Sequence, residues 1–403
     1  MKSFLLAYRT LRRNMRRTLL TATLIAIGVA FVLIFAAFSG SFKNYMIGQI
    51  TDSMLGHLQI HKKGYVASLD NLPMDKNLPA KAIEKITEAI TANPAITDYS
   101  MRLKLGGMIS NFETSTNVRL NGVEPEKEFA TVPLLKDRIT GTGTLNPGEI
   151  FIPDVVAKGM DLKVGDSVVI VATNQHGSMN AITFTISGIV GIISGPGGRD
   201  GYINITDARK LLRIKSEAVN EIVIRTADIA KTNQVAKELT TLLLSGEKKG
   251  IEIHTWDKLS PFSNIANMID LMSISIKIIL ISVVLVSILN VMIISVYERI
   301  KEIGTLTAIG IKRKFIISMF INEGILLGIV GFLAGLVVTA AVVFGVGDLT
   351  IAFGRQDEIL LVPAIHTGEV LFVGVLVTII AMLASLYPAL KAANMSPVDA
   401  LRR

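Results

Sequence analysis

Residues 298–314, with the sequence ERIKEIGTLTAIGIKRK, decide how this chain is organised, because they form a charged segment between two long apolar runs. The segment carries seven charged residues in seventeen positions, with glycines at 304 and 310. Its apolar residues recur at every third position, at Ile300, Ile303, Leu306 and Ile309. This pattern predicts a short amphipathic helix that ends near Gly310, and argues against a solvated connector.

The apolar runs on either side of this segment belong to a set of four. Half of the 403 residues are hydrophobic, and the mean hydropathy is +0.51, which is high for a soluble protein of this length. A helix rises about 1.5 Å per residue, so roughly 20 apolar residues cross the hydrocarbon core of a bilayer. We therefore predict transmembrane helices at residues 18–41, 271–297, 318–346 and 369–390.

Basic residues give the orientation of these helices. They cluster before the first run, after the second and after the fourth, and such clusters mark the cytoplasmic side. Both termini and the loop 298–317 are therefore predicted to be cytoplasmic. The predicted remainder is an extracytoplasmic domain with its stalk at 42–270, a short outer loop at 347–368 and a cytoplasmic tail at 391–403. Because the flanks use most of the net charge of +8, a nucleic-acid partner is not expected.

The N-terminal segment 1–17 is predicted to be an interfacial helix. One helical face collects its apolar residues and the opposite face its arginines, which is typical of a helix lying in the plane of the membrane surface. The apolar face consists of Phe4, Tyr8, Leu11 and Met15. The alternative is a basic flank that only fixes topology.

The outer region 42–270 reads as mixed α/β. Short runs rich in Val, Ile and Thr predict strands, and residues 80–92 and 228–245 have helical spacing. We expect two lobes, one from about 50–112 with 216–265 that holds both helices, and a mostly β lobe at about 113–215. The predicted fold class is an α-helical membrane protein with four transmembrane helices and a large two-lobed α/β domain between helices 1 and 2.

Several kinds of chemistry are excluded by the sequence. It contains no GxxxxGK[ST] motif, no protease signature and no cysteine, so we expect no enzyme activity, no disulfide and no thiolate metal site. The glycine-rich SGPGGRDG at 194–201 precedes a strand-like run and is interpreted as a turn. His57 and His61 are predicted to lie on a strand, which would separate them by roughly 13 Å, so no metal is expected there.

The third apolar run carries two further signals. Small residues recur along one face, at Gly324, Gly328, Gly331 and Gly335, and this spacing lets helices pack closely. Glu323 is an acidic residue inside the membrane, which is a functional candidate by default. Proton coupling is one interpretation. We favour pairing with a basic residue at the interface, because Glu323 lies near the cytoplasmic end of the run.

Layout and motifs together resemble the permease subunits of MacB/FtsX-type ABC transporters, and most closely the lipoprotein-releasing (LolC/LolE-like) permeases. The resemblance covers essentially the whole chain. Its motifs are ERIKEIGTLTAIGIKRKFI after the second run, NEGILLGIVGFLAG in the third and LYPALKAANMSPVDALR at 386–402. Thr307 departs from the pattern, since many members carry a basic residue there.

This resemblance implies how the chain works. Two identical or homologous permease chains would pair above a dimer of cytoplasmic ATPase subunits, which bind ATP and Mg²⁺, and their closure would move the outer domain through the stalk (mechanotransmission). The chain itself would bind no cofactor. The implied ATPase-coupling residues are Glu298, Arg299, Ile300, Glu302, Ile303, Gly304, Leu306, Ile309 and Gly310.

The implied function is release of lipoproteins or export of other amphiphilic substrates from the bacterial inner membrane. Further partners would be membrane lipid and a periplasmic carrier or adaptor protein. The alternatives are MacB-like efflux of drugs, peptides or toxins, and FtsX-like regulation of cell-wall hydrolases. A membrane sensor or peptidase is disfavoured by the missing catalytic motifs.

Overall fold

The chain forms two compact units, Met1–Tyr45 with Asn264–Arg403, and Met46–Ser263. They are called the membrane unit and the outer unit below. A computed structural model describes residues 2–13, 15–73, 75–174, 176–191, 200–244, 250–260, 263–347, 349–353 and 357–394. Most of the glycine-rich segment 194–201, and the predicted tail beyond residue 394, lie outside the described residues.

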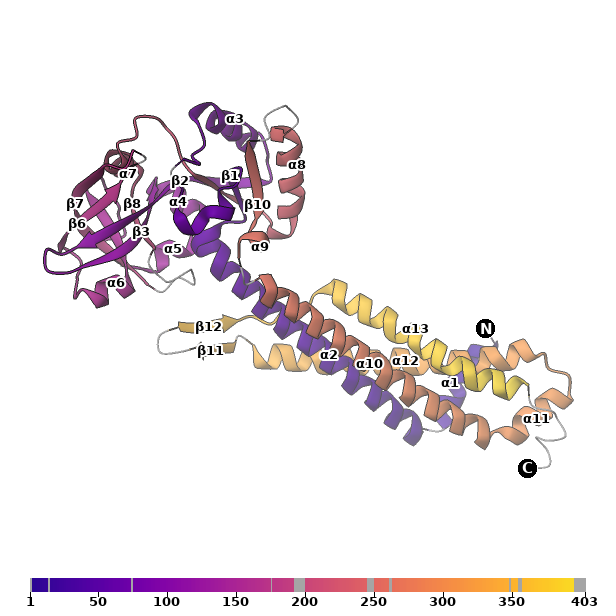
Figure 1. Cartoon of the computed structure of the whole chain (residues 1–403). Helices are drawn as coiled ribbons and strands as arrows, with labels where there is room; N and C mark the ends of the chain where they lie inside the picture. The colour runs from indigo at the N-terminus through magenta and orange to yellow at the C-terminus, as the bar shows by residue number, and fades with distance from the viewer. Residues whose placement is uncertain are drawn as a thin grey trace. The chain divides into compact units, whose positions relative to one another are not determined.

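Four helices of the structure are long and apolar enough to cross a membrane, which confirms the predicted number. They are α2 (Met15–Ile50), α10 (Ser263–Glu298), α12 (Arg313–Val346) and α13 (Thr367–Ala393) (Figure 1). Two short helices accompany them, α1 (Lys2–Arg13) and α11 (Ile300–Ala308). The outer loop contains an antiparallel hairpin, β11 (Leu349–Phe353) with β12 (Asp357–Leu361).

The glycines of α12 serve two neighbouring helices of the same chain. A Cβ atom on Gly335 would lie 2.8 Å from the Ala26 carbonyl oxygen of α2. A Cβ atom on Gly328 would lie 2.7 Å from the Ala381 Cβ of α13. Gly331 likewise meets α2 and Gly324 meets α13. The ridge therefore lets α12 pack closely between two spans.

The outer unit is built on a ten-stranded sheet in the order β10-β1-β9-β2-β3-β8-β5-β7-β4, with β6 paired to both β2 and β7. Six of these strands therefore close into a ring, β2-β3-β8-β5-β7-β6, which leaves none of them an open edge within the ring. The strands are β1 (Leu58–Lys62), β2 (Ile96–Ser110), β3 (Ser115–Val123), β4 (Ile139–Gly141), β5 (Glu149–Pro153), β6 (Ser167–Thr173), β7 (Met179–Val190), β8 (Asp200–Asn204), β9 (Glu221–Thr226) and β10 (Ile251–Thr255).

Strand β2 joins the two lobes of this unit. Its first half, to Arg102, pairs with β9, and its second half, from Leu103, pairs with β3. The two predicted long helices are α3 (Ala80–Thr91) and α8 (Thr232–Leu244), which lie beside β1 and β10 (Figure 1). Five short helices were not predicted: α4 (Pro125–Thr131), α5 (Leu134–Asp137), α6 (Asp154–Gly159), α7 (Ile205–Leu212) and α9 (Trp256–Leu259).

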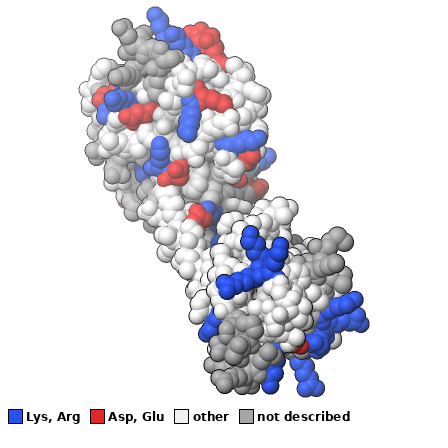
Figure 2. All heavy atoms as spheres, turned by 90° about the vertical axis from the view of Figure 1, so that its right-hand side faces the viewer, with Lys and Arg blue, Asp and Glu red and all other residues white. Residues whose placement is uncertain are grey.

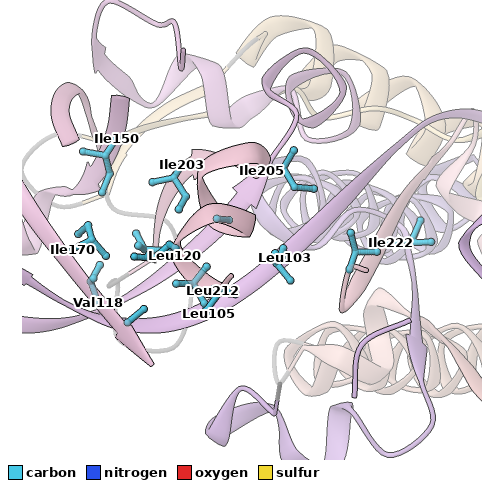
Figure 3. Close-up of a cluster of buried hydrophobic side chains, with 14 of the residues drawn as sticks. Leu103, Leu105, Val118, Leu120, Ile150, Ile170, Ile203, Ile205, Leu212 and Ile222 are labelled. Atoms are coloured by element: carbon cyan, nitrogen blue, oxygen red, sulfur yellow. The ribbon is translucent and has the colours of Figure 1, made fainter. Parts of the chain in front are cut away.

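Alternating side chains of the ring strands build the core. Leu103 and Leu105 of β2 are fully buried in one cluster with Val118 and Leu120 of β3, and Leu105 lies directly opposite Leu120 (Figure 3). Because successive strand residues point to opposite faces, these positions are two apart. Burying each such side chain contributes roughly 2 kcal/mol. A mixed α/β unit inserted after the first membrane helix is therefore present, as the sequence predicted.

Candidate functional site

The predicted amphipathic helix in segment 298–314 is α11, and its two ends are clearly defined. It begins after Arg299 and ends at Ala308, followed by Gly310 with φ +87°. The Gly310 amide donates to the Thr307 carbonyl at 3.1 Å, and the Ile311 amide donates to the Leu306 carbonyl at 3.1 Å. This pair of bonds is the Schellman ending, which needs a left-handed residue that glycine supplies.

The predicted apolar face of α11 is wrong in one respect. Ile300 and Ile303 are buried, Leu306 is half-buried, and Ile309 is 74% exposed. An α-helix turns by about 100° per residue, so residues three apart are rotated by about 60° from each other. After three such steps Ile309 lies on the side opposite Ile300. The helix therefore has a buried anchor at its start and an exposed apolar tip at its end.

A buried arginine holds the start of α11. Arg299 is only 6% exposed, and its Nη1 lies 3.6 Å from Oε2 of Glu323 on α12, which is itself buried. The Nε of Arg299 also lies 3.8 Å from Glu302, one turn further along. The favoured interpretation of Glu323, pairing with a basic residue near the interface, agrees with this geometry.

Helix α1 extends this network to the surface. Arg13 donates from Nη2 to Oε1 of Glu302 at 3.2 Å, and both side chains are more than half exposed. Sequence reasoning missed Arg13, because an ion pair across 289 positions leaves no periodic signal. Of the remaining predicted coupling residues, Glu298 and Gly310 are exposed, whereas Gly304 is buried against the bundle.

The outer unit has its own junction where α2 ends. The helix passes into a π-helical turn, η1 (Thr51–Leu55). Asp52 in this turn accepts a hydrogen bond from Arg225 Nη1 of β9 at 2.7 Å, and His57 Nε2 lies 3.6 Å away. Burial alone would raise the pKa of Asp52, but His57 and Arg225 lower it below its usual value. The end of the long helix is therefore fixed to the sheet by charge.

A second buried arginine lies where β2 passes between the lobes. Arg102 is 1% exposed and pairs with Glu128 of α4 at 2.6 Å and Glu221 of β9 at 2.9 Å. Lys104 reaches the other oxygen of Glu221 at 2.7 Å. Burial raises the pKa of Glu221, but Lys104 and Arg102 outweigh it and lower the pKa to about 2.

His57, just before β1, and His61, within β1, have separate partners. His57 Nδ1 lies 2.7 Å from the Thr226 hydroxyl, and His61 Nε2 lies 3.1 Å from Gln59 Oε1. His61 also stacks on Tyr65 with ring centroids 5.0 Å apart. Among the residues that the structure describes, no three His, Asp or Glu side chains converge as a metal site would require.

Two family models cover most of the chain. Residues 18–242 match the MacB-like periplasmic core domain, and residues 273–397 match the FtsX-like permease C-terminal domain. The chain belongs to the MacB/FtsX family of permeases. The first model covers the first span and most of the outer unit, and the second covers the other three spans.

Individual relatives of this MacB/FtsX-type permease include proteins named for lipoprotein release and for export. It is 23% identical over 303 residues to the lipoprotein-releasing system transmembrane protein LolC of Haemophilus influenzae, covering 72% of this chain and 74% of that protein. It is 25% identical over 411 residues to the macrolide export ATP-binding/permease protein MacB of Nitrobacter winogradskyi, covering 98% of this chain and 59% of that protein.

Among solved structures, the periplasmic region of MacB from Actinobacillus actinomycetemcomitans matches with a TM-score of 0.36 and 12% identity, over 52% of this chain and 93% of that one. The family and the four spans make this protein an ABC transporter permease that crosses the inner membrane several times. Such permeases work with an ATPase.

Proposed function

We propose that this permease passes ATP-driven movement from a cytoplasmic ATPase dimer to its outer unit, and so releases lipoproteins or other amphiphilic substrates from the inner membrane. ATP and Mg²⁺ would be bound by the ATPase, and a second permease chain, identical or homologous, would complete the transporter. Both termini and α11 lie on the cytoplasmic side in this proposal.

The observation that carries the proposal is the division of α11 into an anchor and a tip. Arg299, Ile300 and Ile303 bind its start to the membrane bundle, so a force on α11 is transmitted to α10 and α12. The exposed Ile309 gives a partner an apolar contact, and the same segment carries the exposed charged residues Lys301 and Glu302. An apolar centre with a polar rim is the usual composition of a protein interface.

In this proposal, movement passes from α11 along the long helices to the outer unit. Two sets of ion pairs support the outer part of this path. Within the membrane unit, Lys43 of α2 donates to both oxygens of Asp270 on α10 at 2.7 Å, which ties the two long helices together. Within the outer unit, Asp52 and Arg225 fix the end of the first helix to β9. Movement of these helices would therefore be passed on to the sheet.

The amphiphilic substrate class is supported by the apolar character of the spans. The buried hydroxyl groups of Thr339 and Ser385 each donate to a carbonyl one turn earlier in their own helix, at 2.8 and 2.9 Å. They are thereby satisfied without water. A substrate taken from the outer leaflet needs no aqueous path through the bundle, and the relative LolC is named for lipoprotein release.

The coupling role is tested with Ile309→Asp in the transporter purified from its own membranes with its ATPase. A charge at an apolar contact costs about 2 kcal/mol or more, so we expect at least a tenfold loss of ATPase association, measured by co-purification and by ATP hydrolysis in liposomes. Ile309→Leu is the matched control and should keep full association. Normal association of Ile309→Asp would overturn the docking site, and ATP hydrolysis by the chain alone would overturn the division of labour.

The substrate class is tested separately. Spheroplasts that carry palmitate-labelled lipoproteins should release them only when the chain and its ATPase are both active. Release that is unchanged without the chain, together with loss of resistance to exported drugs, would instead favour efflux.

A further inference from the structure

A groove in the membrane unit lies beside α11 and has a volume of about 420 Å³. It is formed by α1, α11 and the beginning of α12. Its charged lining is Arg9, Arg13, Arg299 and Glu302, and its apolar lining is Leu6, Ile303, Leu306, Ile311, Phe315 and Met319. The groove is thus amphiphilic, with charged and apolar walls side by side.

The charges of the groove favour an anion. Three arginines and one glutamate line the groove, and because Arg299 pairs with Glu323, Arg9 and Arg13 against Glu302 leave one formal positive charge. Arg9 is exposed, and the Arg13 side chain remains 63% exposed even though it pairs with Glu302. Arginine forks bind phosphate oxygens in pairs, which suits a phosphodiester better than a single point charge would.

The apolar part of the groove favours a lipid. Leu6 of α1 is 41% exposed, and the neighbouring Tyr8 is 56% exposed, as expected for a helix that lies against acyl chains. Phe315 and Met319 begin the membrane-spanning part of α12, so the apolar wall continues along a helix that enters the bilayer. A free phosphate would leave these side chains uncovered.

The surrounding surface has the same sign of charge. Figure 2 looks onto the end of the membrane unit that carries α11, where the visible charged side chains are mostly Lys and Arg. Arg12 and Arg16 are also exposed but are not among the residues that line the groove. Basic clusters beside membrane helices attract anionic lipids, which are enriched in the cytoplasmic leaflet.

We propose that this groove is a binding site for an anionic phospholipid, whose phosphate contacts Arg9 and Arg13 while its chains lie along Leu6 and Phe315. The lipid would compete with Glu302 for Arg13 and so alter the contact between α1 and α11. This inference rests on the cytoplasmic orientation and coupling role proposed for α11. Ile309, the apolar tip proposed to meet the ATPase, is not part of the groove lining, whereas Glu302 is.

The experiment uses the full chain, purified and delipidated in detergent, without an ATPase. Native mass spectrometry measures the bound fraction during titration with phosphatidylglycerol, and with zwitterionic phosphatidylcholine as the reference lipid. We expect at least tenfold tighter binding of phosphatidylglycerol. Equal binding of the two lipids would overturn the proposal, as would glycerol 3-phosphate that binds as tightly as the lipid does.

Matched pairs of substitutions locate the site. Arg9→Gln with Arg13→Gln should weaken phosphatidylglycerol binding about fivefold for each arginine, since a basic residue near an anionic lipid contributes roughly 1 kcal/mol. Arg12→Gln with Arg16→Gln removes the same charge outside the groove and should change binding less than twofold. If both pairs of substitutions weaken lipid binding equally, binding depends on general surface charge and the proposed site is wrong.

A loss of lipid binding could also result from misfolding of a variant, so a variant that is expected to bind the lipid more tightly is a useful control. Glu302→Gln removes the one acidic side chain among the described residues of the groove lining and frees Arg13, so phosphatidylglycerol binding should tighten about threefold to fivefold. Unchanged or weaker binding would overturn the role of Arg13. Because no ATPase is present, this result stands or fails independently of the coupling test with Ile309.

Discussion

Among the described residues, each unit has a buried arginine between two glutamates, and the two arginines, Arg102 and Arg299, are held in different ways. Arg102 in the outer unit contacts Glu128 and Glu221 at 2.6 and 2.9 Å, and all three side chains are 1% exposed. Arg299 in the membrane unit lies 3.6 and 3.8 Å from its glutamates, and one of them, Glu302, is 57% exposed.

The difference has a physical consequence for what each network can do. Charges enclosed in a low-dielectric interior must keep their partners, so the Arg102 network fixes the position of β2 between the lobes. A network with one end in solvent can exchange partners at little cost, because water replaces what is lost. The Arg299 network is therefore suited to a segment that moves, and the Arg102 network to one that does not.

The largest effect is expected from Arg102→Met. The substitution leaves Glu128 and Glu221 buried with only Lys104 and Ser100 as close partners, and breaking such a pair costs about 3–5 kcal/mol. Thermal unfolding of the full chain in detergent should show this loss, with faster hydrogen exchange in β2 and β9. Lys158→Met, which removes an exposed pair with Asp154, is the control and should cost under about 0.5 kcal/mol.

A combined variant distinguishes loss of charge balance from loss of packing. Arg102→Met together with Glu128→Gln and Glu221→Gln removes the unpaired charges and should recover most of the stability. If the triple variant is as unstable as the single one, shape rather than charge determines the role of Arg102, and the contrast between the two networks fails.

The second-largest effect is expected from acid, which should destabilise the outer unit around His61 and Glu221. Burial lowers the pKa of His61 from 6.5 to about 4, although the nearby Glu221 carboxylate acts in the opposite direction. As the pH falls, His61 is therefore protonated in the unfolded chain before it is protonated in the folded chain. The contribution of neutral His61 is complete above pH 6.5 and is lost as the pH falls toward 4, by about 3 kcal/mol. Glu221, with an ordinary pKa of 4.5, keeps its contribution until below that pH.

The measurement is thermal unfolding of the full chain at pH 7.5, 6 and 4.5, with hydrogen exchange to show which unit loosens. Protection should fall in β1 and β9 while α12 and α13 stay protected. His61→Gln should flatten most of the dependence between pH 6.5 and 4.5. Equal loosening of both units would mean that the enclosed network is not the acid-sensitive element.

The sequence predicted what depends on local composition and repeats. Hydropathy was sufficient to predict four spans, the alternation of apolar and polar residues to predict strand β1, and a run rich in Val and Ile to predict strand β6. It could not predict that β2 is shared by two lobes or that six strands close into a ring, because pairing between distant strands leaves no mark within a single strand. The short helices α4 to α7 were missed because each spans only one or two turns.

The candidate site was predicted in the same uneven way. The end of α11 followed from Gly310, and pairing of Glu323 followed from its place near the end of a span. The outward position of Ile309 was missed because a three-residue repeat was taken for a single helical face. Arg13 and the groove beside it depend on how α1 folds back on α12, which no local pattern encodes.

The smallest of the three effects is expected from Arg299→Met, and it completes the comparison. Glu323 would lose its 3.6 Å partner while buried, but Glu302 stays in solvent and keeps Arg13, so we expect a loss of about 2 kcal/mol rather than the larger loss at Arg102. Hydrogen exchange should increase in α11 and the first turns of α12, with the outer unit unchanged.

Arg299→Met with Glu323→Gln should recover stability but not ATP-driven activity, because α11 would still lack its anchor. A double variant with normal activity would show that Arg299 holds the bundle together without serving the coupling helix, and a loss as large as that of Arg102→Met would mean that both networks are equally closed.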